Sequence, residues 1–202
     1  MDQPRLLPYL SGRDIQRRVT EIAQQIDADY PESPDAPELW LVGALKGAAF
    51  FLTDLARAIR RGVAIDFVQT SSYGTGVSSS GNVRIIRDIE NDVCGADVIL
   101  VEDIIDSGRT AYAMLDLFQA RGARTVRLAA LLDKPSRRVQ PVPLHYVGFT
   151  APDRFVVGYG MDYSERYRSL PEICFAEFEP ASEDAAENQR VQQAQAPGRR
   201  ME

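Results

Sequence analysis

The sequence predicts an α/β protein in which a mainly parallel sheet is covered by helices. Short apolar runs alternate along the chain with stretches of helical periodicity. These runs are apolar at consecutive positions, which is typical of strands buried on both faces of a sheet. The length of 202 residues, of which 45% are hydrophobic and 26% charged, suits one domain with a core of its own.

The first elements follow from local pattern. A helix is predicted over about 13–28 by apolar residues at helical spacing: Ile15, Val19, Ile22 and Ile26. Prolines over 31–37 end it, and the apolar run 39–42 predicts a buried strand. We expect a turn over 43–47 and then a helix to about Arg60, with Gly62 as its stop. The next strand is predicted at 63–69.

The Ser- and Gly-rich segment that follows admits two readings. It is either a flexible linker or a functional loop, and its place between two strand-like runs favours a mobile loop over about 70–82, with Ser72 and Tyr73 at its start. A strand with alternating charge is expected at 83–89.

The second half repeats the strand–helix–strand order. Strands are predicted at 97–102, 125–132, 144–149 and 155–158, and a helix through Phe118 ends at Gly122. The domain is expected to span 1–178. Residues 179–202 contain almost no core-forming side chains, so we expect a disordered tail, with a solvated helix as the alternative.

Bulk properties exclude several classes of protein. The net charge of −6 provides no basic field for nucleic acid, so we expect no nucleic-acid partner. The two cysteines lack the spacing of a zinc site, and reduced thiols are the simplest interpretation. No signal peptide or membrane span is visible, which makes the cytoplasm the expected location and a membrane partner unexpected.

The most informative stretch is Val98-Ile-Leu-Val-Glu-Asp-Ile-Ile-Asp-Ser-Gly-Arg-Thr110. An apolar strand leads into the carboxylates Glu102 and Asp103, and a third, Asp106, precedes a small turn that opens a helix. Carboxylates at a strand end attract a metal ion, and a glycine-containing turn at a helix N-terminus attracts a phosphate. Together they predict a site for a phosphorylated sugar and a magnesium ion.

Other interpretations of this stretch are weaker. An acidic pair after a strand is often only a solvated loop, but the third carboxylate in a glycine turn argues against that. The GxxxxGK[ST] loop of ATPases is absent. A phospho-receiver domain needs its acidic pair near the N-terminus, whereas this pair lies mid-chain.

Residues 98–110 resemble the phosphoribosyl-pyrophosphate (PRPP) signature of type I phosphoribosyltransferases. Segments 131–138 and 155–171 resemble the purine-binding segments of hypoxanthine–guanine phosphoribosyltransferases, with the bacterial hypoxanthine enzymes most similar. Segment 42–47 resembles their pyrophosphate loop. The resemblance implies the type I phosphoribosyltransferase fold, with a small hood beside the sheet, and transfer of the phosphoribosyl group to a 6-oxopurine in purine salvage.

The resemblance also implies roles at the sugar and phosphates. Glu102 and Asp103 face the ribose and help to hold Mg²⁺, the expected cofactor. Asp106 is the general base that takes the proton from the purine, although a helix-capping role is an alternative. The 5′-phosphate is bound by four consecutive residues: Ser107, Gly108, Arg109 and Thr110. Arg109 is expected to contribute mainly its backbone.

For the other two subsites, the resemblance implies residues from distant parts of the chain. Lys46, Gly47 and Arg168 contact pyrophosphate, and Asp162 holds a second magnesium ion beside the purine. Lys134 donates a hydrogen bond to the purine 6-oxo group. An amino group at the same position could not accept that hydrogen bond. Phe155 stacks on the base and Val156 offers main-chain groups to its edge. The family's cis peptide at Leu45–Lys46 is not visible in sequence.

Two rival functions remain open. One is a phosphoribosyltransferase that prefers guanine or xanthine. The other is a nucleotide-sensing regulator on the same fold, which requires a basic face and a degraded base pocket. The resemblance further implies a homodimer or homotetramer.

Overall fold

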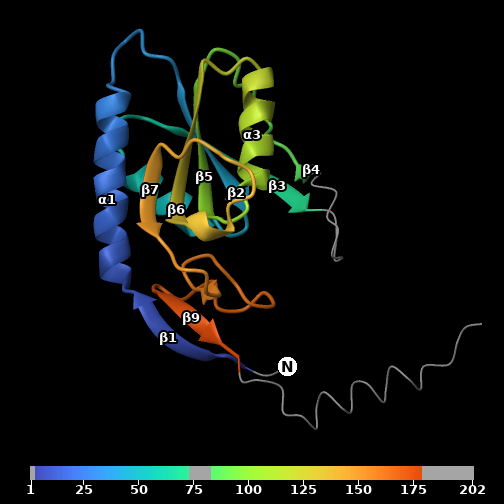
Figure 1. Cartoon of the computed structure of the whole chain (residues 1–202). Coiled ribbons are helices and arrows are strands. Elements are labelled where there is room, and N and C mark those ends of the chain that lie inside the picture. Colours follow the sequence, from blue (N-terminus) through green and yellow to red (C-terminus); the bar gives the residue numbers. More distant parts are fainter. Residues whose placement is uncertain (1–2, 73–82, 179–202) are drawn as a thin grey trace, which may run out of the picture.

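The computed structural model describes residues 3–72 and 83–178 (Figure 1). Tyr73, most of the predicted mobile loop and the predicted tail therefore lie outside the described residues. The helices are α1 (Gly12–Asp29), α2 (Ala49–Ala58) and α3 (Arg109–Ala120), with a short 3-10 turn, η1 (Pro135–Arg137). The strands are β1 (Arg5–Leu10), β2 (Leu39–Leu45), β3 (Ala64–Ser72), β4 (Val83–Arg87), β5 (Asp97–Ile105), β6 (Thr125–Asp133), β7 (Tyr146–Thr150), β8 (Val156–Val157) and β9 (Ile173–Glu177).

The described strands form two sheets. The larger has the order β4-β3-β2-β5-β6-β7 and is parallel except for the β3–β4 pair. This confirms the predicted α/β class and parallel sheet. The smaller sheet, β1-β9-β8, is antiparallel and forms the small hood. In Figure 1 the hood lies beyond the end toward which β7 points.

Alternate residues of the central strands face opposite layers of helices. Leu41 and Ile99 pack with α1 and α2, whereas Val42 and Leu100 pack with α3. Figure 1 shows α1 and α3 on opposite sides of the sheet. Because both faces are covered, the strands are apolar at consecutive positions, as the sequence pattern indicated.

The strands that follow β2 in the chain and those that follow β5 lie on opposite sides of this central pair. From β2 it continues to β3 and β4 on one side, and from β5 to β6 and β7 on the other. The carboxyl ends of β2 and β5 therefore flank the point where the strand order reverses. Open α/β sheets bind ligands at such a point.

Several predicted boundaries were wrong. The turn expected over 43–47 is partly strand, because β2 continues to Leu45 and pairs with β3 through that residue. β5 likewise runs beyond 102 to Ile105, paired with β6. α2 ends at Ala58, before the expected Arg60. The sequence pattern also missed β1 and β9, which pair with each other across the length of the chain. Within the described residues, no helix is long and apolar enough to cross a membrane.

Candidate active site

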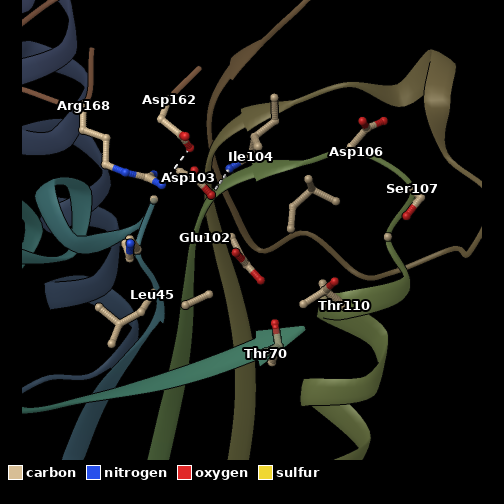
Figure 2. A pocket seen from close by; sticks show the side chains of 16 residues that line it. Leu45, Thr70, Glu102, Asp103, Ile104, Asp106, Ser107, Thr110, Asp162 and Arg168 are labelled. Atoms are coloured by element: carbon tan, nitrogen blue, oxygen red, sulfur yellow. Dashed lines mark hydrogen bonds and ion pairs between the residues drawn. The ribbon is translucent and has the colours of Figure 1, made fainter. Parts of the chain in front are cut away.

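A cavity of about 330 Å³ lies at the carboxyl ends of β2 and β5. Figure 2 shows Glu102 and Asp103 on β5 between Leu45 on one side and the Ser107–Thr110 turn on the other, with Asp162 and Arg168 above them. A second cavity of about 410 Å³ shares Asp103, Asp106 and Asp162 with the first. The two cavities are therefore neighbours that share one wall.

Glu102 and Asp103 form the acidic floor of this site. Only 6% of Glu102 is exposed. Burial raises its pKa well above the usual value, and the neighbouring Asp103 adds to this effect. Burial also raises the pKa of Asp103 to about 6, opposed by the amide of Ile104, which donates to its Oδ1 at 3.0 Å. The buried Glu102 and the partly buried Asp103 together provide hard oxygen donors for a cation.

The turn after β5 is built to expose its backbone. Gly108 is the N-cap of α3 with φ of +83°, and a Cβ at this position would lie 2.2 Å from the carbonyl oxygen of Gln140. The amides of Val139 and Gln140 both donate to the carbonyl of Ser107, at 3.0 and 2.9 Å. This packing fixes the carbonyl away from the cavity and leaves a helix N-terminus facing it, which suits an anion.

The predicted phosphate-binding residues divide into two groups. Ser107, Gly108 and Thr110 line the first cavity, whereas Arg109 begins α3 and is not among the lining residues. The alternative in which Asp106 caps the helix is wrong, because Gly108 occupies the N-cap and no side chain caps it. Asp106 instead lies between the two cavities, and its Oδ1 pairs with Nε of Arg137 at 2.8 Å.

The second cavity contains the predicted base-binding residues Lys134, Phe155 and Val156. Lys134 is only 6% exposed, and its Nζ donates to the carbonyl of Arg154 at 2.7 Å. Burial lowers its pKa. Phe155 is 48% exposed, so its ring is open to stacking, and Val156 is buried in β8. The structure thus brings a buried donor and an exposed aromatic ring together.

The turn after β2 and the segment after β8 together form the wall of the first cavity that lies opposite the Ser107–Thr110 turn (Figure 2). The Leu45–Lys46 peptide is cis. A Cβ on Gly47 would lie 1.7 Å from Oδ2 of Asp103, so only glycine fits beside that carboxylate. Arg168 pairs with Asp162 at 2.8 Å, and its buried Nε has no hydrogen-bond partner among the described residues. Lys46, Gly47, Asp162 and Arg168 all line the first cavity, as predicted.

Sequence reasoning missed other residues of the site. Arg137 pairs with both Asp106 and Asp153, the latter at 3.1 Å. Glu165 pairs with both Lys46 and Arg168, at 2.9 and 3.3 Å. Hydrogen bonds from these two cations lower the pKa of Glu165, with Lys46 the larger cause. Thr70, at the end of β3, also lines the first cavity. Only the position of Arg137 and Glu165 inside the resembling segments could have drawn attention to them.

The predicted metal ligands Glu102, Asp103 and Asp162 line the same cavity. Within residues 3–72 and 83–178, no group of three or more His, Cys, Asp or Glu side chains gathers closely enough to hold a metal ion. Carboxylate oxygens are the donors that Mg²⁺ prefers, and this cation commonly keeps waters and substrate phosphates in its coordination shell.

Comparison with known proteins assigns this fold and site to a class. Residues 8–164 match the phosphoribosyl transferase domain, and the chain belongs to this family. A hypoxanthine phosphoribosyltransferase of Salmonella typhimurium is 44% identical over 160 residues, which cover 79% of this chain and 89% of that protein. A hypoxanthine-guanine phosphoribosyltransferase of Bacillus subtilis is 44% identical, over 81% of this chain and 89% of its own length. Within the family, the chain groups with the hypoxanthine(-guanine) phosphoribosyltransferases.

Other matches agree with this placement. A bifunctional protein TilS/HprT of Listeria innocua is 46% identical over 81% of this chain, which spans only 25% of that longer protein. The crystal structure of a hypoxanthine phosphoribosyltransferase from Staphylococcus aureus superposes with a TM-score of 0.79 and 40% identity, covering 87% of this chain and 92% of that one. This confirms the predicted type I phosphoribosyltransferase fold and the predicted enzyme class of purine salvage.

Proposed function

We propose that the chain transfers the 5-phosphoribosyl group from PRPP to hypoxanthine, giving IMP and pyrophosphate. The observation that carries the proposal is that two neighbouring cavities share Asp106. The N-terminal turn of α3 lines one of them, and the buried Lys134 lines the other. A sugar phosphate in the first cavity and a base in the second therefore bring their reacting atoms together beside Asp106.

The first cavity fits the sugar and its phosphates. The amides and hydroxyls of Ser107, Gly108 and Thr110 receive the 5′-phosphate, which the N-terminus of α3 also favours. Lys46, Gly47 and Arg168 receive the pyrophosphate. Glu102 and Asp103 lie where they meet the ribose hydroxyls and, with Asp162, hold Mg²⁺. The metal supplies positive charge that stabilises the leaving pyrophosphate.

The second cavity fits a 6-oxopurine. One N–H group of Lys134 Nζ donates to the carbonyl oxygen of Arg154, and its remaining N–H groups can donate to the 6-oxo group. Adenine presents an amino donor at that position, so a buried donor would face a donor, which is strongly disfavoured. Phe155 stacks on the ring and Val156 contacts its edge. A purine nitrogen bonds to carbon 1 of the ribose as the bond from that carbon to pyrophosphate breaks. Asp106 takes the proton that the purine loses.

A panel of bases tests this function. The pure protein is incubated with PRPP, Mg²⁺ and, separately, hypoxanthine, guanine, xanthine and adenine, and nucleotide and pyrophosphate are quantified. We expect product with hypoxanthine and none with adenine. A higher rate with guanine or xanthine would change the assigned base, and no product with any base would refute the enzyme function.

The Lys134→Met variant tests the base pocket in the same assay. A hydrogen bond to a charged group contributes about 1.5–3 kcal/mol. We therefore expect kcat/KM for hypoxanthine to fall about 10- to 150-fold, with little change in the KM for PRPP.

Three further proposals follow from the family. The phosphoribosyltransferase domain comprises residues 1–178, the protein acts in the cytoplasm, and it assembles as a homodimer or homotetramer. Light scattering after size-exclusion chromatography tests the assembly, and a monomer at micromolar concentration would contradict it.

A further inference from the structure

Glu165 joins two cations that come from different segments of the same wall of the site. Its Oε2 accepts a hydrogen bond from Nζ of Lys46 at 2.9 Å and lies 3.3 Å from a terminal nitrogen of Arg168. Lys46 follows β2, whereas Arg168 lies on the segment between β8 and β9. One carboxylate therefore bridges two elements that come together only in the folded protein, and it does so at the proposed pyrophosphate subsite.

The backbone at Glu165 adopts a rarely populated conformation. Tyr163 and Arg166 exchange two backbone hydrogen bonds, at 3.1 and 3.0 Å, so Ser164 and Glu165 are the central residues of a tight hairpin turn. Both have positive φ, 51° and 63°. Glycine and asparagine are the usual residues at such positions. Strain of this kind persists where surrounding structure enforces it and gathers at functional sites.

The bridge contributes little to holding the fold together. The side chains of Lys46 and Glu165 are 56% and 65% exposed, and ion pairs this exposed contribute little stability. The turn is instead anchored by the amide of Glu165, which donates to Oδ2 of Asp162 at 2.8 Å. An anchored backbone with a weakly held carboxylate allows that carboxylate to leave its cations without disturbing the turn.

We propose that Glu165 is an internal counter-ion for the pyrophosphate subsite. Its carboxylate bridges Lys46 and Arg168, and it gives up both cations when the pyrophosphate group of PRPP arrives. This inference rests on the proposed roles of Lys46 and Arg168. Because the carboxylate competes for these cations, it weakens the binding of pyrophosphate and favours its release. Glu165 is a positioning residue, since it acts on the substrate through Lys46 and Arg168.

The Glu165→Gln variant tests the inference, because it keeps the size of the side chain and removes the charge. We expect the inhibition constant of inorganic pyrophosphate, measured against PRPP, to fall at least fivefold. The KM for PRPP should fall with it, and the KM for hypoxanthine should not change. The difference from the parent should shrink as ionic strength rises, because salt screens exposed charges. An unchanged or higher inhibition constant would overturn the proposal.

Two control variants separate charge from other effects. Glu172→Gln removes an exposed carboxylate elsewhere in the same segment and should leave the pyrophosphate inhibition constant unchanged. Glu165→Asn also removes the charge and suits the left-handed backbone. Asn and Gln at this position should therefore give the same shift. A shift with Asn alone would assign the effect to the strained turn and overturn the counter-ion role.

The Lys46→Met variant separates this inference from the proposal beneath it. If Lys46→Met leaves pyrophosphate inhibition unchanged, the pyrophosphate role of Lys46 fails. If Lys46→Met weakens inhibition and Glu165→Gln has no effect in the parent, only the counter-ion role fails. We expect the effect of Glu165→Gln to be smaller in the Lys46→Met background, because one of the two contested cations is then absent.

Discussion

Nε of Arg137 lies 2.8 Å from Oδ1 of Asp106, so the proposed general base is ion-paired with an arginine. The same guanidinium pairs with Asp153 at 3.1 Å, and both residues line the second cavity. Asp106 is thus held between the turn proposed to bind phosphate and the cavity proposed to bind the purine. Arg137 itself is 52% exposed, so this pair can rearrange when a purine enters.

Replacing Asp106 with Asn should reduce turnover far more than substrate binding. The amide keeps the size of the carboxylate but cannot accept the purine proton, and general-base catalysis contributes about 10²- to 10⁴-fold. We expect kcat to fall within that range while both KM values change little. Asp116→Asn, at an exposed position on α3, is the matched control and should keep full activity. An unchanged kcat in Asp106→Asn would remove this residue as the base.

Replacing Arg137 with Gln should have a modest effect that depends on Asp106. Half-exposed ion pairs contribute about 0.2–1 kcal/mol, which corresponds to a change of up to about fivefold. We expect kcat/KM for hypoxanthine to fall two- to fivefold because Asp106 loses its orientation, with the KM for PRPP unchanged. In an Asp106→Asn background the effect should disappear. An equal effect in both backgrounds would show that Arg137 acts independently of Asp106.

Replacing Gly108 with Ala should damage both stability and phosphate binding. The residue has φ of +83°, and its new Cβ would lie 2.2 Å from the carbonyl oxygen of Gln140, so the turn must shift. We expect the free energy of unfolding to fall by about 1–3 kcal/mol. The KM for PRPP should rise more than the KM for hypoxanthine. Gly62→Ala, where no atom lies within 4 Å of the added Cβ, is the control. Equal changes in the two KM values would contradict a local role.

His145, the only histidine, should make stability depend on pH. Its Nδ1 accepts the amide of Leu128 at 3.1 Å, which requires that nitrogen to be unprotonated. Partial burial and the nearby charge of Arg127 lower its pKa from the usual 6.5. The unfolded chain therefore binds more protons between the lowered pKa and about 6.5. This contribution to stability is complete above pH 6.5 and is lost as the pH falls through that range.

The His145→Asn variant isolates this contribution, because its amide oxygen can accept the same hydrogen bond without titrating. Urea unfolding of both proteins at pH 5.5 and 7.5 gives the comparison. We expect the parent to lose more stability on acidification than the variant. Equal losses in the two proteins would show that the pH dependence comes from other groups.

Local patterns predicted the strands of the central sheet and β8 of the hood, but not β1 and β9. β2, β5 and most of β6 are buried, so their apolar runs are easily recognised. β1 contains Pro8 at a register shift and is partly exposed along its length, and its partner β9 lies at the other end of the chain. Nothing local in Arg5–Leu10 indicates a strand, because its pairing depends on a distant segment.

The residues of the site also divide into those that the sequence predicted and those that it did not. Asp106, Lys134 and Arg168 lie in segments with a strong family resemblance, and the structure brings them to one site as expected. The pairings of Arg137 and Glu165 were not predictable, because they depend on side-chain contacts between separate turns. The helix-cap alternative for Asp106 failed because the N-cap position lies two residues later, at Gly108, which has a positive φ.

The pairing of β1 with β9 links the second cavity to both ends of the described chain. Val156 on β8 is held by β9, which spans Ile173–Glu177 and is itself completed by β1 from the start of the chain. The cavity that Val156 lines is therefore complete only when the first and last of the described strands have paired, so residues from both ends of the described chain determine its shape.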